Sequence, residues 1–125
     1  MVLADTAEIT LTVVGSETDA EDGDFTEMLY LQNKSDQPLT FKLDENSVNG
    51  SMLTSYPYGY GTYVQIPAGT GSYLPMEFGG DDLSTNAITD VEEIGFQFVL
   101  CTVDETGHPA DLLLEETYTV TAAEK

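Results

Sequence analysis

The densest group of side chains that could do chemistry is an acidic stretch at residues 15–24, GSETDAEDGD. Calcium takes about six to eight oxygen ligands, many of them carboxylate, on a loop that a glycine such as Gly23 allows to turn. The order is not that of an EF-hand, because placing Gly23 sixth puts Thr18 first and Ala20 third. Two interpretations remain open: a calcium-binding loop, or a solvated acidic loop between two strands. The candidate calcium ligands are Glu17, Asp19, Glu21, Asp22 and Asp24.

A second candidate region is the stretch SYPYGYGTY at residues 55–63, which holds four of the seven tyrosines. A tyrosine ring is a flat apolar surface with a polar tip, so exposed rings can stack on a neutral ligand or contact a protein. The alternative is that part of the stretch is a strand whose rings cover the edge of the fold. The absence of tryptophan, the commoner stacking surface for sugars, weakens the glycan interpretation. We predict a ligand site at Tyr56, Tyr58 and Tyr60, and a structural role for Tyr63.

Residues that could support catalysis are isolated in this sequence. His108, the single histidine, lies in the turn-like segment GHPAD, and no nucleophile-elbow motif occurs. Cys101 lies in an apolar run, which is typical of a buried, inert thiol. Acidic residues abound, but no pair stands out as the acid and base of a glycoside hydrolase. We therefore predict no enzyme activity, and a small glycoside hydrolase is the least favoured alternative.

The charge of the chain limits its partners. There are 23 acidic residues against three basic ones, which gives a net charge of −20. Such a protein repels nucleic-acid phosphates and anionic lipid surfaces. No segment approaches the roughly 20 apolar residues of a membrane span, so we expect no direct membrane insertion by this domain. A neutral glycan or a protein remains as the expected partner.

The elements that must position these side chains are strands, because apolar and polar residues alternate along most of the chain. Strands are predicted at about residues 8–14, 25–33, 38–44, 60–66, 72–78, 93–103 and 112–120. Residues 79–90 are predicted to form a loop with one short helical turn, and residues 1–7 a flexible segment. About seven short strands joined at Gly, Pro and Asn predict a single all-β domain, an antiparallel sandwich over residues 1–125.

Several short motifs add a family resemblance over residues 25–103. They are Asn33, Ser35 and Asp36; Ser47 to Gly50; Ala68 and Gly69; and Leu83, Ile88, Ile94, Phe96 and Phe98. Together they resemble an immunoglobulin-like module of uncharacterised Gram-positive bacterial surface lipoproteins and secreted proteins. The resemblance implies an immunoglobulin-like β-sandwich, an extracellular or cell-surface location, and a non-catalytic role. The acidic loop and the tyrosine stretch depart from the module, so any activity particular to this chain is expected there.

The sequence thus predicts a non-catalytic extracellular binding or adhesion module. The alternative from another class is a structural spacer domain stabilised by calcium at the acidic loop. No cofactor is expected, apart from calcium if that loop binds it. The first residues, MVLADTAE, lack the charged and apolar regions of a signal peptide, so either the protein is cytosolic or a leader is absent from this sequence. Because the resemblance implies an extracellular location, we expect the second.

Overall fold

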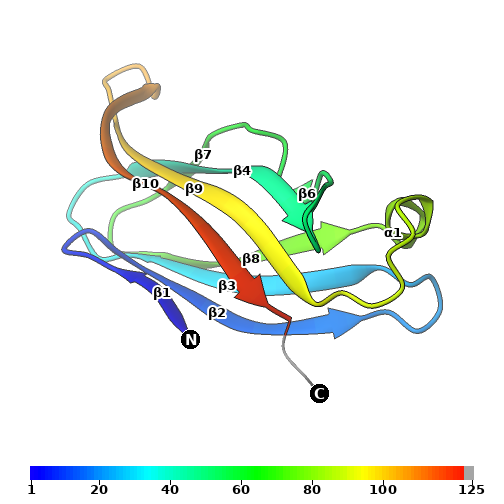
Figure 1. The fold of residues 1–125 in the computed structure, drawn as a ribbon. Helices are drawn as coiled ribbons and strands as arrows, with labels where there is room; N and C mark the ends of the chain where they lie inside the picture. The colour runs from blue at the N-terminus through cyan, green and yellow to red at the C-terminus, as the bar shows by residue number, and fades with distance from the viewer. Residues whose placement is uncertain (123–125) are drawn as a thin grey trace.

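Two antiparallel sheets pack face to face in the computed structural model, which describes residues 1–122 (Figure 1). The first sheet has the order β1 (Val2–Asp5), β2 (Ile9–Thr18), β3 (Phe25–Asn33), β8 (Gly71–Phe78) and β6 (Tyr56–Pro57). The second has the order β10 (Pro109–Thr121), β9 (Glu93–Val103), β4 (Leu39–Val48) and β5 (Ser51–Met52), with β7 (Val64–Ile66) also paired to β4. A short helix, α1 (Gly80–Thr85), connects β8 to the segment before β9.

This strand order confirms the predicted immunoglobulin-like antiparallel sandwich. An immunoglobulin-like domain places strands A, B, E and D in one sheet and G, F and C in the other. Here β2, β3, β8 and β6 take the first four places, and β10, β9 and β4 take the other three. The strand in the D place, β6, has only two residues, so β8 is covered on that side at Met76 and Glu77 alone.

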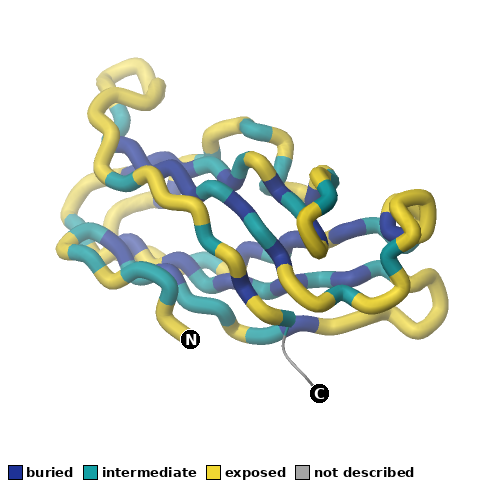
Figure 2. Tube along the Cα trace, in the orientation of Figure 1, coloured by how far each residue is buried: buried dark blue, intermediate teal, exposed yellow. Residues whose placement is uncertain are grey.

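The core lies between the sheets and follows from the alternation in the sequence. Figure 2 shows the buried positions recurring along the strands of both sheets. The inward side chains of β3 meet those of β4 and β9, where the Phe41 and Phe98 rings stack with centroids 6.1 Å apart. Burying each large apolar side chain contributes about 1.5–3 kcal/mol. Phe96 and Phe98 face this core as predicted, and Cys101 is a buried free thiol.

Three segments differ from the predictions. Residues 1–7 were expected to be flexible, but Val2–Asp5 forms β1. The ladder continues at Met1, whose terminal ammonium group donates to the Val13 carbonyl and whose carbonyl accepts from the Val13 amide. The strand predicted at 60–66 is shorter, because a turn occupies residues 58–60 and only Val64–Ile66 pairs with β4. Conversely, β4 extends to Val48 past an irregularity between Asp44 and Ser47.

The connections between strands lie where the sequence has residues that favour turns. Asn49 and Gly50 adopt positive φ angles of 50° and 85° between β4 and β5. The Asn49 side chain donates to the Asp90 carbonyl and accepts from the Glu92 amide, both at 2.8 Å, and thereby anchors the segment before β9. The helical turn predicted within residues 79–90 is α1. Within residues 1–122, no helix is long and apolar enough to cross a membrane.

Candidate functional site

The tyrosine stretch forms one wall of a groove of about 550 Å³ beside β4. We call this groove the tyrosine groove. Its lining comes from β4, from the segment between β5 and the turn at residues 58–60, and from α1. The lining residues are Asp44, Glu45, Asn46, Met52, Leu53, Thr54, Tyr56, Gly59, Tyr60 and Asp82. Segments far apart in the sequence therefore meet at two of the predicted tyrosines.

Tyr56 and Tyr60 form an aromatic pair on this wall. Their ring centroids are 5.3 Å apart at an interplanar angle of 72°, which is an edge-to-face contact. Both rings remain about half exposed, at 47% for Tyr56 and 52% for Tyr60. A hydrogen bond between the two side chains, followed by partial burial and the charge of Asp82, raises the pKa of Tyr60 to about 12. The pair therefore presents exposed ring surface at the groove, and Tyr60 stays protonated well above physiological pH.

The other two tyrosines of the stretch lie apart from this pair. Tyr58 was predicted to belong to the ligand site, but its ring packs against the core at 6.0 Å from Phe41 and does not line the groove. Tyr63 was predicted to be structural and also lies outside the groove. Its ring, 40% exposed, lies 5.2 Å from the Lys42 ammonium. Burial and the neighbouring Cys101 raise the pKa of Tyr63.

Buried polar side chains hold the loop that carries the rings. Asn46 and Ser55 are almost fully buried, and the Ser55 hydroxyl donates to Asn46 Oδ1 at 3.1 Å. Asn46 Nδ2 donates to the Gly59 carbonyl at 3.4 Å, and the Asn46 carbonyl accepts from the Leu53 amide at 3.0 Å. A side chain at Gly59 would collide with Ser55, whose backbone nitrogen and oxygen lie within 2.8 Å of an added Cβ. The backbone of the loop is therefore held by these buried side chains, while the rings of Tyr56 and Tyr60 remain exposed to solvent.

The chemistry of the groove suits a ligand with hydroxyl or cationic groups. Three carboxylates line it, from Asp44, Glu45 and Asp82, and within residues 1–122 no basic side chain does. Lys42 approaches Asp44 Oδ2 at 3.5 Å from outside the lining. Carboxylates accept hydrogen bonds and disfavour anions. Glu45 has a φ of 49° where β4 is irregular, and non-glycine residues in this conformation are concentrated at functional sites.

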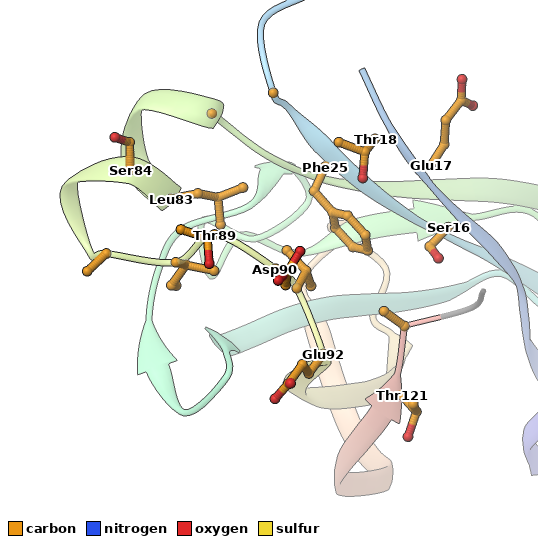
Figure 3. Close-up of a pocket in the computed structure, with 16 residues that line it drawn as sticks. Ser16, Glu17, Thr18, Phe25, Leu83, Ser84, Thr89, Asp90, Glu92 and Thr121 are labelled. Atoms are coloured by element: carbon orange, nitrogen blue, oxygen red, sulfur yellow. The ribbon is translucent and has the colours of Figure 1, made fainter. Parts of the chain in front are cut away.

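A second and larger depression, of about 1,120 Å³, lies at the end of the sandwich beside α1 (Figure 3). We call it the acidic-loop pocket. Its apolar part includes the buried side chains of Phe25 and Leu83, which point toward its middle in Figure 3. The full lining is Ser16, Glu17, Thr18, Gly23, Phe25, Gly80, Leu83, Ser84, Ala87, Ile88, Thr89, Asp90, Val91, Glu92, Thr121 and Ala122.

Of the predicted calcium ligands, Glu17 lies near the end of β2 and the other four lie in the connection between β2 and β3, where several of them hold backbone groups. Asp19 Oδ1 accepts from the Glu21 amide at 2.8 Å, and Asp22 Oδ1 accepts from the Asp24 amide at 3.0 Å. Asp24 Oδ1 accepts from the amide of Gly80 at 2.7 Å, which ties the loop to the start of α1.

Of the five predicted ligands, only Glu17 lines the pocket, and its side chain points away from the middle. Among residues 1–122, no group of three or more His, Cys, Asp or Glu side chains is arranged to hold a metal ion. Calcium binding by this loop stays a prediction.

Sequence reasoning overlooked several residues that the fold brings to these sites. Asn46, Met52 and Asp82 reach the tyrosine groove from three separate elements, and no local motif signals them. Glu27 is a different case, because the alternation in β3 places it on the core side between Phe25 and Leu29. It is fully buried and lies opposite Ser16 of β2. That alternation was the available signal for a buried glutamate.

His108 occupies an exposed turn, as predicted. Asp104 Oδ1 accepts from the amides of Thr106 and His108, both at 2.9 Å, and from the Thr106 hydroxyl at 2.7 Å. The Thr106 hydroxyl also lies 2.7 Å from His108 Nδ1. These hydrogen bonds lower the pKa of Asp104, and the bond from the Thr106 hydroxyl has the largest effect. The contacts close the hairpin between β9 and β10.

Comparison with known proteins finds similarity only among solved structures. No protein-family model and no curated protein matches the sequence. Among solved structures, the crystal structure of a FixG-related protein from Vibrio parahaemolyticus is similar, with a TM-score of 0.45 and 17% sequence identity. The match covers 94% of this chain and 98% of that one. A likeness this distant carries no inference about function.

Proposed function

We propose that this chain is a non-catalytic extracellular binding module that holds a neutral glycan in the tyrosine groove. The observation that carries the proposal is the Tyr56–Tyr60 pair, two half-exposed rings in edge-to-face contact on the wall of a groove of about 550 Å³. The extracellular setting rests on the resemblance described above. The binding role rests on the geometry of the groove.

A neutral, hydroxyl-rich ligand fits the chemistry of this groove in two ways. The ring faces offer apolar surface for the carbon face of a sugar, and the edge of one tyrosine already packs on the other. The carboxylates of Asp44, Glu45 and Asp82 accept hydrogen bonds from hydroxyl groups. An anionic ligand would meet these three carboxylates and the net charge of −20.

Pre-organisation supports the same role. Asn46, Ser55 and Gly59 fix the backbone of the loop before any ligand arrives. Binding then orders few additional groups, so less of the interaction energy is lost to conformational entropy.

An array of neutral oligosaccharides tests the proposal with three purified proteins. The parent is compared with the double variant Tyr56→Ala, Tyr60→Ala and with Tyr73→Ala, which truncates a ring of β8 that is 61% exposed and lies outside the groove. We expect the parent and Tyr73→Ala to bind a common set of oligosaccharides. The double variant should lose about tenfold or more in affinity, since each stacked ring contributes on the order of 1 kcal/mol.

Either of two results would overturn the proposal. One is a parent that binds no neutral oligosaccharide on the array. The other is a double variant that binds as the parent does. A circular-dichroism melt of each variant distinguishes lost binding from lost fold.

A further inference from the structure

The strands at the edges of the two sheets differ in length and regularity, and β10 is by far the longest of them. Natural β-sheet proteins blunt their edges with short strands, prolines, bulges or lysines, because an open edge invites another strand. The edge strand β1 has four residues and an irregularity after Val2, while β5, β6 and β7 have two or three residues each. By contrast, β10 has 13 residues and pairs with β9 alone among the strands of residues 1–122. It forms the outer edge of its sheet in Figure 1.

The two halves of β10 differ in regularity. Its first half begins with Pro109 and has register irregularities on both sides of Leu112, where the hairpin is exposed along its length (Figure 2). From Leu114 to Thr121, each residue pairs in unbroken register with Leu100 to Glu93 of β9. This second half contains no proline, glycine or lysine. It is therefore an uninterrupted edge, long enough to accept a further strand, whose charged side chains are those of Glu115 and Glu116.

The side chains of this half set the chemistry of an added strand. Residues directly opposite each other in an antiparallel pair point to the same face. Tyr118 and Val120, opposite Phe96 and Ile94, therefore lie on the core side, and the Tyr118 ring is 5.8 Å from that of Phe96. Glu116, opposite Phe98, is on the same face but is exposed.

Glu115 and Glu116 disfavour the addition of an acidic strand to this edge. Glu116 lies on the core-side face and the neighbouring Glu115 on the outer face, so an added strand meets a carboxylate on either side. Like charges directly opposite each other are destabilising in a sheet, and charges of opposite sign are stabilising. A second copy of the chain would bring the same glutamates and another charge of −20. The partner that these charges complement is basic.

We propose that Leu114–Thr121 of β10 accepts an extended basic segment of a partner protein as an additional strand of the sheet. Main-chain hydrogen bonds to the open edge supply the affinity in this mode of recognition. Lysine or arginine beside Glu115 and Glu116, followed by apolar residues beside Tyr118 and Val120, supplies the specificity. This edge is separate from the tyrosine groove, because none of its residues lines that groove.

A short synthetic peptide tests this edge directly. In the probe peptide, two consecutive lysines, one for each glutamate, adjoin a stretch in which threonine alternates with valine; in the control peptide, glutamate replaces both lysines. Calorimetry measures affinity, and amide hydrogen exchange locates the protected backbone. We expect saturable binding of the lysine peptide, no binding of the glutamate peptide, and new protection confined to residues 114–121.

Charge variants separate recognition at this edge from general attraction to an acidic protein. Glu115→Lys, Glu116→Lys and the control Glu21→Lys, Asp36→Lys change the net charge equally, and the two control positions are exposed and lie outside β10. We expect affinity to fall about tenfold or more in the first variant and to change little in the second. Glu115→Gln, Glu116→Gln repeats the test with less risk to folding, and we expect a smaller fall in the same direction.

Several outcomes would overturn the proposal. They are the absence of binding, equal weakening by the two lysine variants, and protection that lies outside β10. A parent protein that elutes as a dimer with protected β10 amides would assign the edge to a second copy instead.

Discussion

In the tyrosine groove, the polar side chains that hold the backbone are buried and the aromatic rings are exposed; in the acidic-loop pocket, the arrangement is reversed. Asn46 and Ser55 fix the tyrosine loop from beneath, so that Tyr56 and Tyr60 are available to a ligand. At the acidic loop, apolar side chains lie toward the middle, and carboxylates such as those of Asp22 and Asp24 accept backbone amides.

This difference shows why a cluster of chemically suited side chains is not by itself a site. A carboxylate that caps a turn has part of its hydrogen-bonding capacity committed to the fold. A ring on a backbone that is fixed elsewhere has its whole exposed face free. The tyrosine groove is therefore the better candidate for a ligand, although the acidic-loop pocket is the larger of the two.

The largest expected effect separates the tyrosines themselves. Tyr58→Ala removes a ring that packs against Phe41 and the core, so we expect a loss of about 2–3 kcal/mol in the free energy of unfolding. The midpoint of thermal unfolding should fall by about 10 °C. The double variant Tyr56→Ala, Tyr60→Ala removes two half-exposed rings and should cost less than about 1 kcal/mol. Equal losses in the two proteins would mean that the exposed pair is structural after all.

Gly59 provides the next prediction, because the tyrosine loop requires a residue without a side chain there. In Gly59→Ala, the new methyl group would meet Ser55 backbone atoms within 2.8 Å, so the loop must shift. We expect a loss of about 1–2 kcal/mol together with weaker ligand binding in the groove. Gly15→Ala is the matched control, since an added Cβ there meets nothing within 4 Å. Chemical denaturation of both variants measures the difference, and a Gly59→Ala protein as stable as the control would contradict the rigid-loop interpretation.

The strands were the most predictable part of this molecule, because their signal is local. Strands β3 and β9 have the predicted bounds, residues 25–33 and 93–103, because β3 buries every second side chain and β9 is apolar along most of its length. Alternation fails where the backbone leaves the extended conformation. Glu45 at a φ of 49° interrupts the pattern of β4, and the turn at residues 58–60 shortens the strand predicted at 60–66.

The site was less predictable, because its parts come from separate elements. The sequence predicted a ligand site at Tyr56, Tyr58 and Tyr60, because all three lie in the same glycine- and proline-containing stretch, and two of them line the groove. The turn at residues 58–60 directs Tyr58 to Phe41 instead. Asp82 reaches the groove from α1, and only the folded chain brings it to Tyr56 and Tyr60. A groove is a tertiary feature, so periodicity and spacing contain no signal for its far wall.

A smaller effect is expected at the acidic loop, where Asp24 ties the loop to α1. Asp24→Ala removes the acceptor of the Gly80 amide, so we expect a loss of about 1 kcal/mol in stability and no change in binding at the tyrosine groove. Asp24→Asn keeps a side-chain oxygen at the same place and should retain most of the stability. Denaturant titration of the two variants decides between a lost hydrogen bond and a lost charge.

The same variants test the calcium hypothesis. If the acidic loop binds calcium, the midpoint of the parent should rise with added calcium chloride, and the rise should be absent in Asp24→Ala. A midpoint that is independent of calcium in the parent would refute the hypothesis of a calcium-stabilised spacer.

The smallest expected effect concerns the pKa of the Tyr60 hydroxyl. Its hydrogen bond with Tyr56 raises its pKa from the ordinary value of 10 to about 12, so the folded state favours the neutral phenol. This contribution to stability is fully present below pH 10 and is lost as the pH rises from about 10 through 12. Carbon-13 NMR of labelled tyrosine, with the Tyr60 signal assigned by Tyr60→Phe, should show Tyr60 still protonated at about pH 11. Tyr56→Phe should lower that pKa toward 10, because its hydroxyl is the largest cause of the shift. If Tyr60 titrates near 10 in the folded parent, the two hydroxyls do not interact, and the pair offers the groove two independent rings rather than one fixed surface.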